Sequence, residues 1–467
     1  MSLFSKIVRN TALPFILRRE NQGSALRHWR FLEKSQFWSR ERLRSYQWEK
    51  LTALLRHAYE TSPYYTAVFK ERGLTPESFR NFGDLSRLPI LTRNDLFEKG
   101  KEILSVKYDI ADLQNVLTGG TTGQQAPLYR DQESYNIKLG VAWRHENYMG
   151  RKPCDRMAFI WPAHVDFVHD VTFKSIFKDR YILGEYLFNA GSSDPKIMEK
   201  FYRDIMDYKP AFFKVFPAAF CGLTQYMVEK GYRPPRVKGV LSTGEPLYNK
   251  QRKLFEEYYG CPVFDMYGSR EVGNTASECP AHEGLHVAME TSYVEFAENG
   301  NAVEFGREGE ILITDLTNFA FPMIRYQIND YGIPIEKECS CGRGLQLMSP
   351  GVGRLIDDFW GPDGIRHTGN VLGIHLTAEP AHQIGQMQVI QKTLTDFLVK
   401  ITRKPEPSSE VLEFIPMQMK KIIGQGINVK IEIVDEIPKE KSGKTRFLKC
   451  EINPPAGVSE DKTNIRP

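Results

Sequence analysis

The strongest constraint on the fold is an alternation of short apolar runs with helical stretches, which begins near residue 114. The runs are NVLTG, RMAFIWP, AFFKVFP, VKGVLSTG and PVFDMYG. A short apolar run followed by a helix and another run is typical of strand–helix–strand crossover units. Because such crossovers join parallel strands, the alternation predicts an α/β chain with mainly parallel sheets.

This pattern changes toward the C-terminus. Residues 285–335 contain HVAMETSYVEF, EGEILITDL and FPMIRYQI, which predict an antiparallel β subdomain joined by turns. From residue 386 the periodicity predicts strand, strand, helix and strand, a small α+β unit. Glycines cluster between these regions in GVGRLIDD, residues 351–358. We therefore expect a joint between two domains there.

The predicted domains have unequal sizes. A large N-terminal domain covers residues 1–353, and its first part, residues 1–107, is mostly helical. A small, mobile C-terminal lid domain covers residues 354–467.

Composition excludes several protein classes. Of the 467 residues, 41% are apolar and 26% charged, which excludes disordered, fibrous and coiled-coil proteins. No apolar run approaches the ~18 residues of a transmembrane segment, and no signal peptide is recognisable, so we expect a cytoplasmic protein. A formal charge of +4 predicts no nucleic-acid partner. Seven cysteines, an odd number, favour thiols over a disulfide framework.

Residues 1–20 predict an amphipathic helix. Its apolar side chains lie among Lys6, Arg9, Arg18 and Arg19. Two interpretations are open: a helix packed on the protein body, which we favour, and a weak contact with a membrane surface.

A glycine- and threonine-rich loop, LTGGTTGQQAP, occupies residues 117–127 after a strand-like run. Backbone N–H groups of such a loop can surround phosphate oxygens, and threonine hydroxyls add donors. It is not a P-loop of the G-x-x-x-x-G-K-[ST] type. A plain turn is the alternative.

Three further motifs carry candidate functional residues. Glu271 lies in YGSREVG, directly after a predicted strand, where ligands bind in α/β sheets. Asp330 is expected in a turn just after a strand, where a carboxylate can accept both hydroxyls of a ribose. Lys444 follows a Ser-Gly turn in PKEKSGKTRF. A surface carboxylate, a plain turn and a solvated basic turn are the respective alternatives.

Taken in this order, the motifs resemble those of the adenylate-forming enzyme superfamily, over nearly the whole chain. The closest resemblance is to its phenylacetate–CoA ligase-like group, especially the capsular polysaccharide biosynthesis proteins. The segments that carry it are GEPL, YGSREVG, ECPAHEGLHV, LTNFAFPMIRY and CSCGRG.

The resemblance implies a two-step reaction that uses ATP and Mg²⁺. A small carboxylic acid attacks the α-phosphate of ATP, and an acceptor then takes the acyl group from the acyl-adenylate. The acceptor is coenzyme A, or an amine or hydroxyl in surface polysaccharide biosynthesis. Two alternatives are a catalytically inactive nucleotide-binding scaffold and a transferase that uses a preformed nucleotide donor.

The resemblance also implies residue roles. The residues that hold phosphates would be Thr118, Gly119, Gly120, Thr121, Thr122 and Gly123. The residues around adenine and ribose would be Gly244, Glu245, Pro246, Tyr267, Gly268, Ser269, Asp330 and Arg354. Glu271 would bind Mg²⁺, and Asp357 or Asp358 would be the hinge. Lys444 would reach the substrate carboxylate, and it forms the catalytic set with Glu271 and Thr121.

A cysteine pair at Cys339 and Cys341 suggests a metal site. Cys279 and His286 lie about 55 residues upstream, and His282 lies between them. Structural zinc takes four nitrogen or sulfur ligands, often two from each of two loops. These elements recur in the group named above, so we expect one structural Zn²⁺. The sequence leaves open whether His282 or His286 is the ligand.

Overall fold

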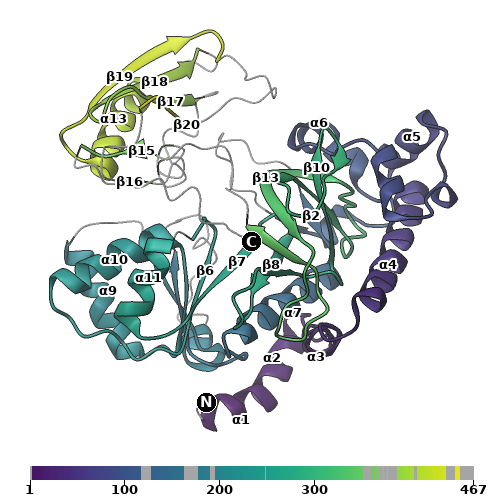
Figure 1. Cartoon of the computed structure of the whole chain (residues 1–467), viewed down its shortest axis with the longest axis horizontal. Helices are drawn as coiled ribbons and strands as arrows, with labels where there is room; N and C mark the ends of the chain where they lie inside the picture. Colours follow the sequence, from purple (N-terminus) through teal and green to yellow (C-terminus); the bar gives the residue numbers. More distant parts are fainter. Residues whose placement is uncertain are drawn as a thin grey trace. The chain divides into compact units, whose positions relative to one another are not determined.

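The computed structural model describes residues 3–116, 128–161, 177–189, 195–247, 249–350, 359–362, 366–367, 372, 376, 387–403, 407–437 and 448–452. These residues form two compact units, one from the residues up to 350 and one from those after 358 (Figure 1). The predicted boundary at residues 353–354 lies outside the described residues and stays a prediction.

One mixed sheet organises the first unit. Its order is β11-β10-β12-β13-β14-β9-β8-β7-β6-β5-β3-β4. The strands are β3 (Met157–Trp161), β4 (Glu185–Asn189), β5 (Phe212–Val215), β6 (Val240–Thr243), β7 (Val263–Ser269), β8 (Gly273–Glu278), β9 (Leu285–Val287), β10 (Ser292–Glu298), β11 (Asn301–Ala302), β12 (Gly309–Asp315), β13 (Tyr326–Ile335) and β14 (Leu347–Pro350).

The predicted division of this sheet is confirmed. Strands β4, β3, β5, β6 and β7 pair in parallel. Strands β8 to β14 pair antiparallel. One predicted strand pairs differently: in the described part of the NVLTG run, Asn115 belongs to β1 (Gln114–Asn115), which pairs antiparallel with β2 (Tyr129–Arg130) outside the large sheet. Because β2 returns directly beside β1, this run belongs to an antiparallel pair and not to a crossover unit.

Alternating side chains of the parallel strands build two cores. On one face, Phe213 packs with Phe220 and Phe255, which come from the covering helices α10 (Pro217–Glu229) and α11 (Asn249–Tyr259). Helix α9 (Pro195–Tyr208) lies beside them (Figure 1). On the other face, Phe212 packs with Phe264 and with Met149, which follows α7 (Gln132–Tyr148). This alternation follows from the two-residue period of a strand.

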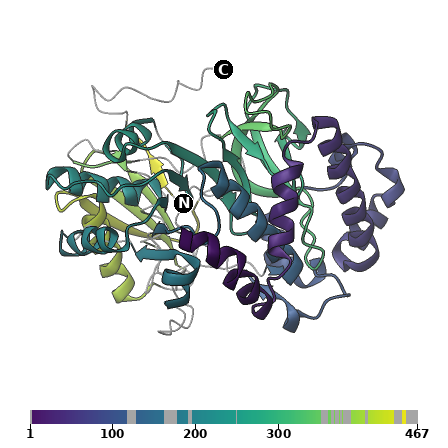
Figure 2. The ribbon, with the colours of Figure 1, turned by 90° about the horizontal axis from the view of Figure 1, so that it is seen from below.

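Helices dominate the N-terminal region, as predicted. They are α1 (Leu3–Asn10), α2 (Ala12–Arg19), α3 (Ala25–Ser35), α4 (Arg40–Thr61), α5 (Pro63–Glu71) and α6 (Arg93–Ile103). The single helix expected over residues 1–20 divides at Thr11 into α1 and α2, drawn in purple in Figure 2. Thr92 caps α6 through a capping box with Asp95.

The second unit has the predicted strand, strand, helix and strand. These are β17 (Met387–Gln391), β18 (Asp396–Thr402), α13 (Ser409–Ile423) and β19 (Asn428–Val434), with β20 (Leu448–Cys450) completing the order β19-β18-β17-β20. A short pair, β15 (Phe359–Trp360) and β16 (Arg366–His367), precedes them. None of the helices in the described parts of the chain is both long and apolar enough to cross a membrane.

Candidate functional site

The motif GEPL, which the resemblance expects beside adenine, follows the carboxyl end of β6. The register pairs Thr243 of β6 with Met266 of β7, so Gly244 and Tyr267 follow side by side. Gly244 has φ +84°, and a Cβ atom there would lie 2.4 Å from a ring carbon of Phe216. Only glycine accepts both conditions. The turn therefore presents Glu245, which is buried, at the sheet edge where ligands bind in α/β folds.

Tyr267 and Asp330 meet across the sheet. The Tyr267 hydroxyl donates a hydrogen bond to Asp330 Oδ2 at 2.9 Å. These residues come from β7 and β13, which are far apart in the sequence. The structure therefore brings together two residues to which the resemblance gives neighbouring roles at the nucleotide.

The expected position of Asp330 was wrong in detail, because it lies inside β13 and not in a turn after a strand. The pairing of β12 with β13 moves from Glu310–Tyr331 to Leu312–Gln327, so Ile311 alone faces residues 328–330. Asn329 adopts φ +68° within this bulge. A bulge re-aims a side chain at the edge of a ligand site, and here it re-aims Asp330.

Two buried cations fix the turn that carries Glu271. Arg130 Nη2 donates to the carbonyl oxygens of Arg270 and Glu271, both at 3.1 Å. Lys138 Nζ donates to the next carbonyl, that of Val272, at 2.6 Å. Three consecutive carbonyl groups are thus held from one side. Glu271 itself is buried.

Lys138 also forms a buried ion pair with Asp315, with Nζ 2.7 Å from Oδ2. Burial lowers the pKa of Lys138 to about 8, and Asp315 opposes this shift. Burial likewise lowers the pKa of Arg130. Sequence reasoning missed both cations. The available signal was a lysine that shares the buried side of α7 with Ser134 and Val141.

Several predicted site residues lie outside the described residues. They are Thr118, Gly119, Gly120, Thr121, Thr122, Gly123, Arg354, Asp357, Asp358 and Lys444. Their roles stay predictions. Pro246, Gly268 and Ser269 are described: Pro246 follows Glu245, and the other two end β7.

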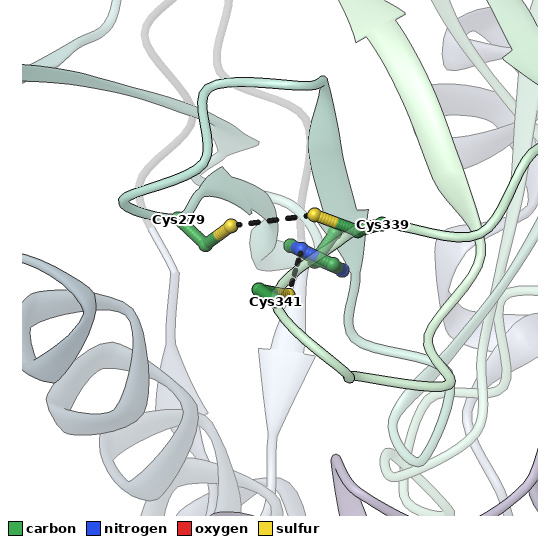
Figure 3. A group of neighbouring side chains, drawn as sticks. Cys279, Cys339 and Cys341 are labelled. Atoms are coloured by element: carbon green, nitrogen blue, oxygen red, sulfur yellow. Dashed lines mark hydrogen bonds between the residues drawn. The ribbon is translucent and has the colours of Figure 1, made fainter.

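Four predicted metal ligands gather at one place. The ligand atoms of Cys279, His286, Cys339 and Cys341 all lie within 4.8 Å of one another. Cys279 Sγ is 3.6 Å from Cys339 Sγ, and Cys341 Sγ is 3.4 Å from His286 Nε2 (Figure 3). All seven cysteines are described, and none forms a disulfide. Three sulfur atoms and one nitrogen are a donor set that suits tetrahedral Zn²⁺.

The protonation chemistry of the cluster also suits a cation. Burial, and then the positive charge of Arg343, lower the pKa of His286 to about 3, so the imidazole is neutral. Burial opposes ionisation of Cys341, but hydrogen bonds from Arg343 bring the pKa of this thiol below its usual value. Burial raises the pKa of Cys339 to about 12. A bound divalent cation would offset the free-energy cost of ionising this buried thiol, because a thiol that coordinates a metal loses its proton.

His282 lies elsewhere. Its Nδ1 is 3.2 Å from Glu278 Oε2, and its ring packs on Phe264 with centroids 5.1 Å apart. Among the two histidines that the sequence left open, the structure places His286 in the cluster, on β9 beside Leu347 of β14.

Comparisons with known proteins agree with this architecture. The CapK C-terminal domain family matches residues 367–451. The phenylacetate–coenzyme A ligase of Thermus thermophilus is 25% identical over 330 residues, which make up 68% of this chain and 72% of the relative. The phenylacetate–coenzyme A ligase of Escherichia coli is 26% identical over 308 residues, covering 62% of this chain and 67% of the relative.

Solved structures share the fold. A 2-hydroxyisobutyryl-CoA ligase in complex with 2-HIB-AMP and CoA, in its thioesterification state, has a TM-score of 0.61 at 19% identity. The match covers 88% of this chain and 90% of that one. An open conformation of the same ligase has a TM-score of 0.56 at 18% identity, over 86% and 90% of the two chains. The resemblance drawn from the motifs and the expected fold class are both confirmed.

Proposed function

From the confirmed resemblance to the phenylacetate–CoA ligase-like group of the adenylate-forming superfamily, we propose that this AMP-forming ligase activates a carboxylic acid with ATP and transfers the acyl group to coenzyme A. The observation that carries the proposal is the contact between Tyr267 and Asp330 beside the buried Glu245, at the carboxyl end of the parallel strands. The fixed turn of Glu271 belongs to the same end of β7.

In the first step, an oxygen of the substrate carboxylate attacks the α-phosphorus of ATP. The bond from that phosphorus to the bridging oxygen breaks, and pyrophosphate leaves with the electron pair. Asp330 would accept hydrogen bonds from the ribose hydroxyls, and the Tyr267 hydroxyl keeps its carboxylate oriented. Holding the reacting groups in a fixed geometry accounts for much of the rate enhancement in phosphoryl-type transfers.

Glu271 would hold Mg²⁺, which neutralises charge on the phosphates. The two cations behind the turn, Arg130 and Lys138, contact its carbonyl oxygens and so leave the carboxylate available. Lys444 would stabilise the charge that develops between the attacking carboxylate and the α-phosphate.

In the second step, the acceptor atom attacks the acyl carbon and its proton passes to solvent. The bond from that carbon to the phosphate oxygen breaks, and AMP leaves with the electron pair. Coenzyme A is the acceptor that the confirmed resemblance supports best. A second acceptor class, an amine or hydroxyl in surface polysaccharide biosynthesis, is the alternative that the resemblance implies.

We assign the cysteine cluster to one structural Zn²⁺. Cys279, His286, Cys339 and Cys341 would provide a closed set of four ligands, and three of them are buried. Tyr148 and Leu347 pack around the cluster and shield it from water. This environment is typical of a structural site and not of a catalytic one, which keeps a position open.

The test is a panel of carboxylic acids assayed by pyrophosphate release from ATP, with and without coenzyme A. We expect acid-dependent release, and an acyl-CoA product only when coenzyme A is present. Asp330→Asn should raise KM for ATP at least ~10-fold, since a charge-assisted hydrogen bond to the ribose is weakened. The matched control is Glu304→Gln, an exposed carboxylate on a turn.

Two results would replace this proposal by an alternative. ATP binding without pyrophosphate release for any acid would indicate a nucleotide-binding scaffold. Product formation from a preformed nucleotide donor, without ATP, would indicate a transferase.

A further inference from the structure

Helices α1 and α2 are apolar on two opposite sides. On the inner side, Val8, Leu13 and Leu17 are buried and pack with Trp143 and Cys154 of the protein body. On the outer side, Phe4 is 60% exposed, Ile7 53% and Phe15 70%. A helix on the surface of a globular protein normally turns a polar face to water.

The outer apolar residues share their side of the helices with positively charged residues. Phe4 and Ile7 are three residues apart, so they lie on the same side of α1. Phe15 lies three and four residues before Arg18 and Arg19, which are exposed on the same side of α2. Single exposed apolar residues are common, but here three of them occur on two consecutive helices.

Among the residues that the structure describes, no carboxylate forms an ion pair with Lys6, Arg18 or Arg19 on this face. Residues 3–19 contain no acidic residue, and Lys6, Arg18 and Arg19 are exposed. Arg9 is the exception, because it binds Asp155 at 3.1 Å and turns inward. The nearest acid along the chain, Glu20, is bound by Lys178 at 2.7 Å.

The segment packed beside these helices has the same character. Ile182 and Leu183 join the inner core with α1 and α2. Phe177 is 50% exposed and Tyr181 49%, and their rings are 5.1 Å apart. Lys178 lies between them, and Asp179, 3.7 Å from its ammonium, is the acidic group of this segment.

The two helices are also fixed in place before any partner binds. Ser5 Oγ donates to Asp155 at 2.7 Å, and Arg9 Nε donates to the Pro153 carbonyl at 2.7 Å. Their outer face is therefore presented without a folding step, which lowers the entropy cost of docking.

We propose that the outer face of α1 and α2 is a docking surface for an anionic lipid bilayer. Phe4, Ile7 and Phe15 enter the boundary between headgroups and acyl chains, while Lys6, Arg18 and Arg19 contact lipid phosphates. A second copy of this chain is disfavoured as the occupant, because pairing of the same faces brings like charges together. With so few inserting side chains the binding is reversible and sensitive to salt. This inference does not depend on the proposed reaction.

The first test is sedimentation of the full chain with vesicles of phosphatidylcholine, alone or with 30% phosphatidylglycerol, at 0.1 M salt. We expect at least ~10-fold tighter binding to the anionic vesicles. Two triple variants should each lose at least ~10-fold of this binding: Phe4→Ser/Ile7→Ser/Phe15→Ser and Lys6→Gln/Arg18→Gln/Arg19→Gln. Far-UV circular dichroism and Tm confirm that the variants are folded.

Matched controls come from other exposed positions. Phe305, which is 50% exposed on a turn, supplies the apolar control Phe305→Ser. Three exposed lysines supply a control of equal charge loss, Lys70→Gln/Lys101→Gln/Lys238→Gln. Both controls should bind anionic vesicles as the wild type does. Equal losses in controls and test variants would overturn the proposal.

A second measurement locates the inserting face. In Phe15→Trp, the added fluorescence should shift to shorter wavelength with anionic vesicles and be quenched by brominated lipid. The same substitution at Phe305 should show neither change. Equal binding to neutral vesicles, or no shift at position 15, would overturn the proposal. So would a lipid-free dimer that dissociates in the Phe4→Ser/Ile7→Ser/Phe15→Ser variant, because a second copy would then cover the face.

Discussion

Replacing Lys138 by methionine tests the electrostatic support of the Glu271 turn. The substitution keeps the unbranched stem up to the position of Cε but removes the ammonium that bridges Asp315 and the Val272 carbonyl. Asp315 would then lose its ion-pair partner, in a position with 0% side-chain exposure, while the charge of Arg130 still acts on it.

The expected loss of stability is large. Lys138 is 9% exposed and Asp315 0%, so water screens little of their interaction. Removing one partner of a buried ion pair costs about 3–5 kcal/mol. The double variant Lys138→Met/Asp315→Asn removes both charges, and the amide oxygen can still accept from Thr317. The Val272 carbonyl then loses its donor and the new amide N–H₂ group gains no strong acceptor from methionine, but no buried charge is left unpaired, so we expect the double variant to lose less stability than the single one.

Urea unfolding followed by tryptophan fluorescence measures these differences. Five of the six tryptophans, all but Trp360, belong to the first unit, so the signal reports on it. The control is Lys200→Met, which breaks an exposed pair with Asp204 and should cost less than ~0.5 kcal/mol. A loss below about 1 kcal/mol for Lys138→Met, or a double variant no more stable than the single one, would refute the reasoning.

Three further outcomes are expected. The purified protein should contain one zinc ion, which Cys339→Ser/Cys341→Ser loses and Cys221→Ser retains in elemental analysis. Lys444→Ala should slow pyrophosphate release at least ~100-fold but spare transfer from a supplied acyl-adenylate; an unchanged rate would remove Lys444 from the adenylation step. The control for this variant is Lys449→Ala, an exposed lysine on β20. Asp265→Asn should make the protein more stable above pH 7, because it removes a carboxylate that is costly to ionise in its buried position.

Local patterns were sufficient for much of the fold. Strands β3, β5, β6 and β7 are apolar because their side chains contribute to cores on both faces of the sheet. Such continuous apolar runs are visible in the sequence. Strand β8 was not predicted, because its sequence, GNTASE, has no large apolar residue. It forms a strand because β7 and β9 pair with it on both sides.

Local sequence patterns were also insufficient to predict the contacts within the candidate site. The motif around Tyr267 indicated a ligand-binding strand end, but its hydrogen bond to Asp330 depends on a bulge in β13. That bulge exists only in the register with β12, which no local pattern specifies. Likewise, the choice of His286 over His282 follows from the pairing of β9 with β14. Residue types were readable, whereas distances across the sheet were not.

The pH dependence of Asp265 follows from its burial. Burial, and then the charge of Glu278, raise the pKa of Asp265 to about 7 from a usual value of 3.8. Between about pH 4 and pH 7 the folded chain thus keeps a proton that the unfolded chain has released. Stability therefore falls as the pH rises through this window, by up to ~4 kcal/mol from this group. In Asp265→Asn the amide oxygen carries no charge and can still accept the hydrogen bond from the Met266 N–H group, which is 2.9 Å long in the wild type.

Urea unfolding at pH 5 and pH 8 tests this argument. The variant and the wild type should have similar stability at pH 5, and the variant should be the more stable of the two at pH 8. Asp207→Asn, at an exposed position, should follow the wild type at both values. An Asp265→Asn profile parallel to that of the wild type would show that Asp265 is already ionised in the folded chain at pH 5.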